Sequence, residues 1–151
     1  MLELEAIRSV MAERVPFTRA LGVQVTAVAP ERVEVTMPES PDRFNHVGTV
    51  HAAAQFGLGE TAAGTMVISA FSDLQGRGAV PLAASATITY HKASRGELRG
   101  VATLSADEQA RIRNDMATSN KARFSIPVQL LDREDSVTSE MSVEWVLLGP
   151  R

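Results

Sequence analysis

The residue types with the most chemical potential lie in one segment, residues 45–72, which reads NHVGTVHAAAQFGLGETAAGTMVISAFS. Asn45, Gly48 and His51 precede a run of small and apolar residues, and Glu60 is the one carboxylate within the segment. Burial among apolar neighbours disfavours the charged form of a carboxyl group, so we expect a raised pKa for Glu60. A pKa closer to neutral pH is what a general base requires.

Residues 47–71 are expected to form one long central helix, because they contain many good helix formers and no proline. Their apolar residues occupy every face, as in a helix surrounded by protein. Gly57, Gly59 and Gly64 each cost about 1 kcal/mol relative to alanine in a helix interior, so we expect other atoms to approach closely there. The polar residues within the run argue against a membrane span.

The start of this helix offers free backbone N–H groups and the positive end of its dipole, so the amides of Ala52 and Ala53 are natural donors to a developing oxyanion. Between His51 and Glu60 a helix turns by about 180° and rises by roughly 13 Å. The two side chains therefore cannot both address one carbonyl group within a single chain. If both act, Glu60 comes from a second subunit, and we expect an obligate homodimer with two equivalent sites.

Structural roles compete with each of these assignments. An ion pair with an arginine across an interface would also explain a lone glutamate in an apolar helix, since an unpaired buried charge is costly. His51 is equally suited to a hydrogen bond at the helix start, and Asn45 to capping or to a turn. The residues alone leave these alternatives open.

Composition limits the class of protein. With 151 residues and 44% hydrophobic content, the chain fits a single domain over residues 1–151. The net charge of -3 gives no basic excess for nucleic acid. The absence of cysteine removes disulfides and thiol catalysis, and no spacing of the histidines indicates a metal site. The N-terminal segment is acidic and unlike a secretory signal, so we expect a cytoplasmic protein.

The remaining chain predicts a short amphipathic helix over residues 1–16, ended by Pro16, and then mostly strands. Residues 38–46 and 73–81 are expected to be loops, and residues 106–120 a charged loop or an exposed helix. Pro127 indicates an edge position or a bulge. The strands are expected at 22–28, 32–37, 83–92, 98–104, 121–131 and 137–148. An antiparallel sheet of five or six strands wrapped around one long helix satisfies this α+β pattern.

Several of these residues together resemble a known family. The matching features are Leu21-Gly22-Val23 at a strand start, Asn45, Gly48, His51 and Glu60 at their spacings, and the later passage YHKASRGELRGVATL. From about Val15 to Leu147 the chain resembles the hotdog-fold acyl-CoA thioesterases of the phenylacetate-pathway type. It departs from them at Ala52 and Ala53, where the family commonly has two glycines, and in having Glu60 where close relatives often have aspartate.

The resemblance implies a hotdog fold, a homodimer or a dimer of dimers, and hydrolysis of small or medium acyl-CoA thioesters. It assigns Glu60 as general base or nucleophile and the Ala53 amide to the oxyanion hole. Asn45, Gly48, His51 and Thr61 would position the carbonyl group, the loop or a water molecule. Basic residues would meet the coenzyme A phosphates, and these are Lys92, Arg95 and Arg123. No cofactor is implied beyond the coenzyme A of the substrate.

Two other functions fit the same fold. A non-catalytic hotdog module that binds acyl-CoA or serves in assembly is favoured by the alanines at positions 52 and 53. Hydratase or dehydratase chemistry uses a histidine and an acid at spacings that this chain lacks. The sequence does not determine acyl-chain specificity, or the choice between a dimer and a tetramer.

Overall fold

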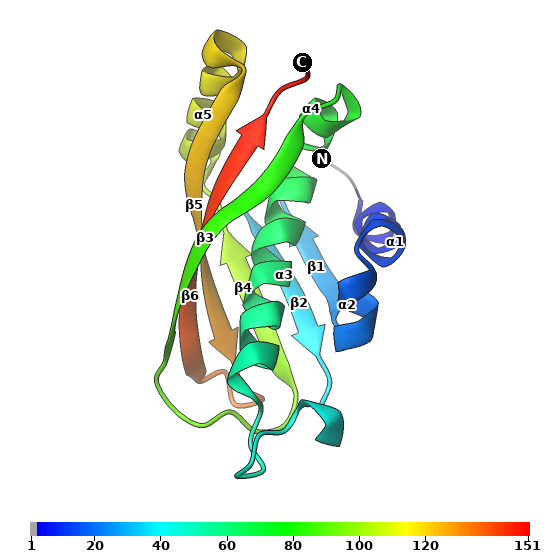
Figure 1. The fold of residues 1–151 in the computed structure, drawn as a ribbon, viewed down its shortest axis with the longest axis vertical. Helices are drawn as coiled ribbons and strands as arrows, with labels where there is room; N and C mark the ends of the chain where they lie inside the picture. The colour runs from blue at the N-terminus through cyan, green and yellow to red at the C-terminus, as the bar shows by residue number, and fades with distance from the viewer. Residues whose placement is uncertain (1–2) are drawn as a thin grey trace.

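The long helix α3 (Ala52–Ala70) is the axis around which the rest of the chain is arranged (Figure 1). The computed structural model describes residues 3–151. Six antiparallel strands form one curved sheet in the order β1-β2-β4-β5-β6-β3. Their bounds are Gln24–Ala29 (β1), Arg32–Met37 (β2), Val80–Tyr90 (β3), Leu98–Thr103 (β4), Lys121–Leu131 (β5) and Val137–Leu148 (β6). The expected α+β class, with a sheet wrapped around one helix, is confirmed.

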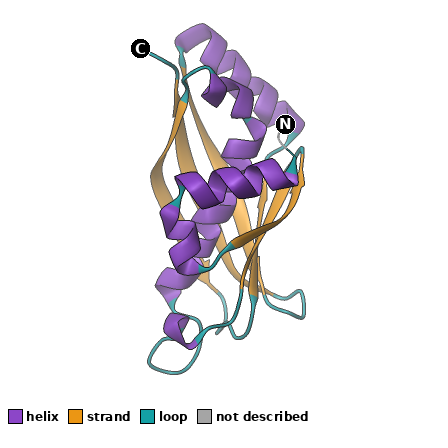
Figure 2. Cartoon of the chain, turned by 90° about the vertical axis from the view of Figure 1, so that its right-hand side faces the viewer, coloured by secondary structure: helices purple, strands orange, loops and turns teal. Residues whose placement is uncertain are grey.

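The other helices pack around this core. They are α1 (Leu4–Arg14), α2 (Pro16–Leu21), the short 3-10 helix η1 (Pro41–Arg43), α4 (Ser72–Gly76) and α5 (Ala106–Ser119). Helices α1 and α2 lie beside β1 and α3. Figure 2 shows the helices gathered on one side of the strands. Leu58, Ala62 and Met66 of α3 are fully buried against the sheet. No helix within residues 3–151 is long and apolar enough to cross a membrane.

Close packing against α3 explains two of its glycines. A Cβ atom at Gly57 would lie 2.7 Å from Cδ2 of Leu21, and one at Gly59 would lie 2.5 Å from Sδ of Met141. At Gly64 the nearest atom, in the Trp145 ring, would be 3.6 Å away, which is an ordinary contact. The predicted close approach is therefore present at the first two glycines, where side chains of α2 and β6 reach the helix.

Several boundaries differ from those expected from the sequence. The helix expected over 47–71 begins at Ala52, because the preceding residues form a hydrogen-bonded loop. The first helix, α1, ends at Arg14 just before Pro16, as expected. Pro16 also begins a second helix, α2, since its fixed φ and missing N–H suit a first helical turn. Part of the loop expected over 73–81 is the helix α4. The strands over 121–131 and 137–148 are confirmed.

Pro127 lies in β5, an interior strand of the sheet, so the prediction of an edge strand is wrong for the strand as a whole. The pairing of β4 with β5, however, extends only to Ala102 and Val128. Beyond that point the chain leaves the sheet to form α5. Pro127 therefore stands where β5 has no β4 neighbour, and its missing N–H breaks no bond on that side.

Helix α5 fastens the C-terminal end of α3 through Arg113. The guanidinium donates to the Ala70 carbonyl (2.7 Å) and to both carboxylate oxygens of Asp73 (2.9 and 3.0 Å). Its Cζ also lies 5.3 Å from the centre of the Phe71 ring. The hydrogen bond from Arg113 lowers the pKa of the Asp73 carboxyl.

We expect Arg113→Ala to lower the free energy of unfolding by about 1–2 kcal/mol, because it removes a half-exposed ion pair, a carbonyl hydrogen bond and a cation–π contact. The pKa of Asp73 is depressed in the folded protein, so the ion pair with Arg113 contributes its full stability at neutral pH. The stability from this ion pair is lost as the pH falls through the depressed pKa of Asp73. Urea unfolding at pH 7 and at pH 3 measures both effects, and an equal loss at the two pH values would contradict this assignment.

One stripe of α3 is left uncovered by the rest of the chain, and we call it the open stripe. Its members recur at helical spacing and are exposed or half-buried: Ala53, Phe56, Glu60, Gly64 and Ile68. Next to it, β3 is a free edge of the sheet, and its Val80 and Leu82 side chains are 51% and 52% exposed. A long apolar edge strand is a ready template for pairing with another chain.

Candidate active site

The loop before α3 is organised by Asn45. Its side-chain Oδ1 accepts from the N–H groups of Val47 (3.1 Å) and Thr49 (3.0 Å), and its Nδ2 donates to Oγ1 of Thr49 (2.8 Å). Gly48 has φ +75°, in the left-handed region that glycine adopts readily. The turn role foreseen for Asn45 is therefore present, and these hydrogen bonds hold the loop that leads to the helix start.

His51 is the N-cap of α3. Its ring Nδ1 accepts from the N–H of Ala53 at 3.0 Å, and its own N–H donates to the Arg43 carbonyl at 2.7 Å. The first helical hydrogen bond then runs from Gln55 to the His51 carbonyl (3.1 Å). In this arrangement the Ala53 amide, the expected oxyanion donor, is occupied by the histidine ring.

Glu60 lies at the centre of the open stripe, half-buried. Among residues 3–151 its carboxylate has neither a hydrogen-bond donor nor a cation within ion-pair distance. Burial raises the pKa of Glu60, as predicted from its apolar neighbours. Thr61, the next residue, is buried and lies off the open stripe. The ionisable group on the open stripe is thus a carboxyl group with no partner among the described residues.

Because burial raises the pKa of Glu60, the ionised carboxylate destabilises the folded chain at neutral pH. This loss of stability is absent below the pKa that Glu60 has in the unfolded chain, because Glu60 is then protonated in both the folded and the unfolded protein. It is complete above the raised pKa of the folded protein. We therefore expect Glu60→Gln to raise the melting temperature at pH 7.5, and this gain to vanish near pH 4, at about the ordinary glutamate pKa.

Thermal unfolding of the two proteins at both pH values measures this difference, with exposed Glu31→Gln as the matched control. A lower melting temperature for Glu60→Gln at pH 7.5 would instead mean that the assembled protein supplies Glu60 with a cation or hydrogen-bond donors.

The three basic residues expected to meet coenzyme A do not lie together in one chain. Lys92 and Arg95 belong to the loop between β3 and β4, at the same end of the molecule as the start of α3 (Figure 1). Lys92 is paired with Asp132, at 3.0 Å between Nζ and Oδ2. Arg123 lies near the start of β5, beside α5 and at the opposite end.

Two hollows of about 350 Å³ each flank the start of α3. The lining of one includes Asn45, Ala52, Tyr90, His91 and Lys92. Here the Tyr90 hydroxyl donates to the Ala52 carbonyl at 3.0 Å. The other lies between α2, η1 and α3, and its lining includes Phe17, Leu21, Phe44, His51 and Ala53. The first turn of α3 is thus accessible from both sides.

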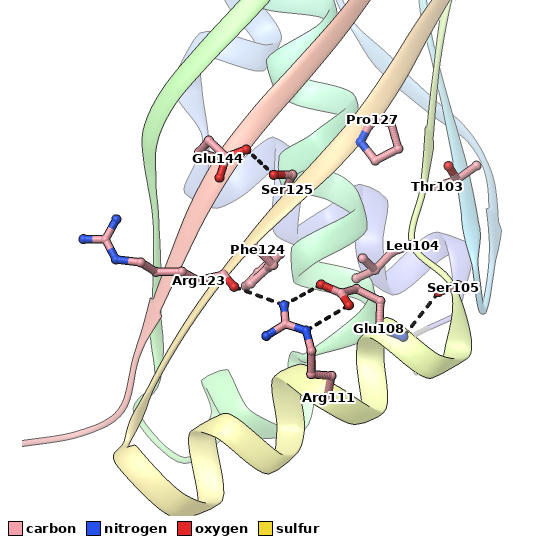
Figure 3. A pocket seen from close by; sticks show the side chains of 10 residues that line it. All are labelled: Thr103, Leu104, Ser105, Glu108, Arg111, Arg123, Phe124, Ser125, Pro127 and Glu144. Atoms are coloured by element: carbon pink, nitrogen blue, oxygen red, sulfur yellow. Dashed lines mark hydrogen bonds and ion pairs between the residues drawn. The ribbon is translucent and has the colours of Figure 1, made fainter.

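A larger hollow of about 570 Å³ lies between α5 and β5 (Figure 3). Three of its charged side chains already have partners: Arg111 pairs with Glu108 and donates to the Arg123 carbonyl at 3.1 Å, and Glu144 accepts from Ser125. The Arg123 side chain points away from this cluster. Neither Glu60 nor the start of α3 lines it, so size alone does not make it the candidate site.

Sequence reasoning missed the polar residues that support the helix start. Gln55 is 4% exposed, and Ser94 and Ser139 are fully buried. The Gln55 Oε1 accepts from both hydroxyls, at 3.1 and 2.7 Å. The one available signal was a single amide side chain in an otherwise apolar helix face. No group of three or more metal-binding side chains occurs within residues 3–151.

A curved antiparallel sheet wrapped around one long central helix is the hotdog fold. Residues 4–147 match the family described as a domain of unknown function, DUF4442, and the chain belongs to that family. No curated protein sequence matches the chain significantly.

Solved structures are similar along almost the whole chain. A Pseudomonas aeruginosa protein, PA5026, described as a probable thioesterase, is 25% identical with a TM-score of 0.87, covering 99% of this chain and 97% of that one. The Escherichia coli PaaI protein, from the phenylacetic acid degradation operon, is 15% identical with a TM-score of 0.72, covering 97% of both chains. Haemophilus influenzae thioesterase HI1161 is 13% identical with a TM-score of 0.77, and the match covers 99% of this chain and 92% of that one. The resemblance to hotdog-fold thioesterases is confirmed.

Proposed function

We propose that the protein is an acyl-CoA thioesterase acting on small or medium acyl groups, with Glu60 as general base or nucleophile. The observation that carries this proposal is an unpaired, half-buried carboxylate on the same open stripe as the first turn of α3. An uncompensated buried acid is costly and calls for a function or a partner. Similarity to a probable thioesterase over 99% of the chain supports the assignment.

The site is completed by a second copy of the chain. Ala53 and Glu60 lie on one face of α3 but are separated by about 10 Å along the axis, too far to act on one carbonyl group. A two-fold axis crossing the open stripe midway between them would set the Glu60 of one subunit beside the Ala53 of the other. The same association would cover the open stripe and pair the free β3 edges.

At this composite site the thioester carbonyl oxygen accepts hydrogen bonds from N–H groups of the first turn of α3. Glu60 takes a proton from a water molecule as the water oxygen attacks the carbonyl carbon. The tetrahedral intermediate then collapses, the C–S bond breaks, and the leaving thiolate takes the proton from Glu60. Direct attack by the Glu60 carboxylate, followed by hydrolysis of a mixed anhydride, is the other available route.

The remaining predicted residues support these steps. Asn45 and Gly48 shape the loop, and His51 orients the first turn. Thr61 follows the base in sequence but is buried off the open stripe, so it would act only through the helix backbone. Lys92 and Arg95 would meet the coenzyme A phosphates near the helix start. Arg123 would take part only if another subunit brings it to that end.

The second candidate function is a non-catalytic module that binds acyl-CoA. It is favoured by one observation: the Ala53 N–H is already bonded to the His51 ring at 3.0 Å. To donate to an oxyanion, the Ala53 N–H must first break its hydrogen bond to the His51 ring. A chain that keeps the bond would bind a thioester without stabilising its hydrolysis.

Free-thiol release from a panel of acyl-CoAs tests the proposal, with wild type, Glu60→Gln and the control Glu31→Gln measured side by side. We expect turnover by wild type and by the control, and a fall on the order of 100-fold for Glu60→Gln, as loss of a general base predicts. Binding of acyl-CoA without release of thiol by the wild type would establish the non-catalytic module instead.

A further inference from the structure

Gln55 occupies a position that an apolar residue would ordinarily hold. It lies in the first turn and a half of α3 and is 4% exposed. Its Nε2 donates to the Val50 carbonyl at 3.0 Å, and its Oε1 accepts from Ser94 at 3.1 Å and from Ser139 at 2.7 Å. An unpaired amide here would cost about 1–3 kcal/mol, so these three bonds must form together.

The bonds of Gln55 join segments that are far apart in the sequence. Ser94 belongs to the loop between β3 and β4, and Ser139 to β6. Val50 is held from both sides, because its N–H also donates to the Ser94 carbonyl at 2.9 Å. The backbone entering α3 is thereby fixed to the loop that carries Lys92 and Arg95.

We propose that Gln55 is a positioning residue, which sets the N–H groups of the first turn of α3 at a fixed place relative to the loop holding Lys92 and Arg95. This inference rests on the proposed function, since it assigns the oxyanion donors to the helix start and coenzyme A to that loop. Donors that stabilise a transition state must be aligned before the reaction begins. A buried amide with three hydrogen bonds provides that alignment between the loop and the helix.

A structural role and a positioning role predict different behaviour when the whole network is removed. Gln55→Met alone leaves two buried hydroxyls unpaired and lowers stability. The triple variant Gln55→Met, Ser94→Ala, Ser139→Ala removes those hydroxyls too, so much of the stability returns. If Gln55 is a positioning residue, the kcat of the triple variant stays at least about 10-fold below that of wild type. The reason is that displacing catalytic groups by about 1 Å lowers the reaction rate by up to about 100-fold. The matched control is Arg113→Ala, which destabilises the other end of α3 and leaves kcat unchanged.

Thiol release and urea unfolding of these four proteins are measured together with amide hydrogen exchange, which does not depend on turnover. We expect faster exchange of residues 50–54 in the triple variant, with residues 58–66 unchanged. A triple variant with wild-type kcat and wild-type exchange at 50–54 overturns the positioning role. If no wild-type turnover is found, the proposed function fails, and exchange alone decides whether Gln55 fixes the helix start.

Discussion

The unpaired Glu60 carboxylate on the open stripe of α3 is the constraint on which the rest of the molecule depends. Residues 3–151 of its own chain offer it neither a cation nor a hydrogen-bond donor, and burial raises its pKa. Helix geometry separates it by about 10 Å from the Ala53 amide, the oxyanion donor of the proposed mechanism. Under the proposed function, a single chain therefore carries both halves of the site without joining them.

The fold serves this arrangement by exposing one face of α3 and holding the rest. Gly57 and Gly59 let side chains of α2 and β6 pack directly on the helix. Arg113 secures its C-terminal end through Ala70 and Asp73, and Gln55 secures its start. A helix fixed at both ends holds the open stripe in place, and β3 beside it is a free edge of the sheet. Under the proposed function, these are the surfaces that a second subunit covers.

The periodicity of the sequence predicted most of this fold because the relevant forces are local. Alternation of apolar and polar residues gave the two C-terminal strands their observed bounds, 121–131 and 137–148. The start of α3 was misplaced by five residues, since the bonds of Asn45 and His51 that end the preceding loop have no periodic signature. Pro16 does follow the end of the first helix, but the second helix that it begins was missed, because proline is compatible with both positions.

The candidate site was predictable only in part. The raised pKa of Glu60 followed from its apolar neighbours, and the turn role of Asn45 from its residue type. The Gln55 network was not predictable, because its serine partners lie 39 and 84 residues away along the chain. The separation of Arg123 from Lys92 likewise depends on the direction of β5 in the sheet, which no local pattern encodes.

A mixed dimer tests the composite site most directly. One chain carries Glu60→Gln, and the other carries Ala53→Pro, which removes an amide donor in the first turn of α3, where proline is tolerated. Each variant alone is expected to be inactive. If each site combines Ala53 of one subunit with Glu60 of the other, the mixed dimer has one intact site and recovers about half of wild-type thiol release per dimer. A mixed dimer as inactive as its parents would contradict the account, since it would place both groups of each site in the same chain.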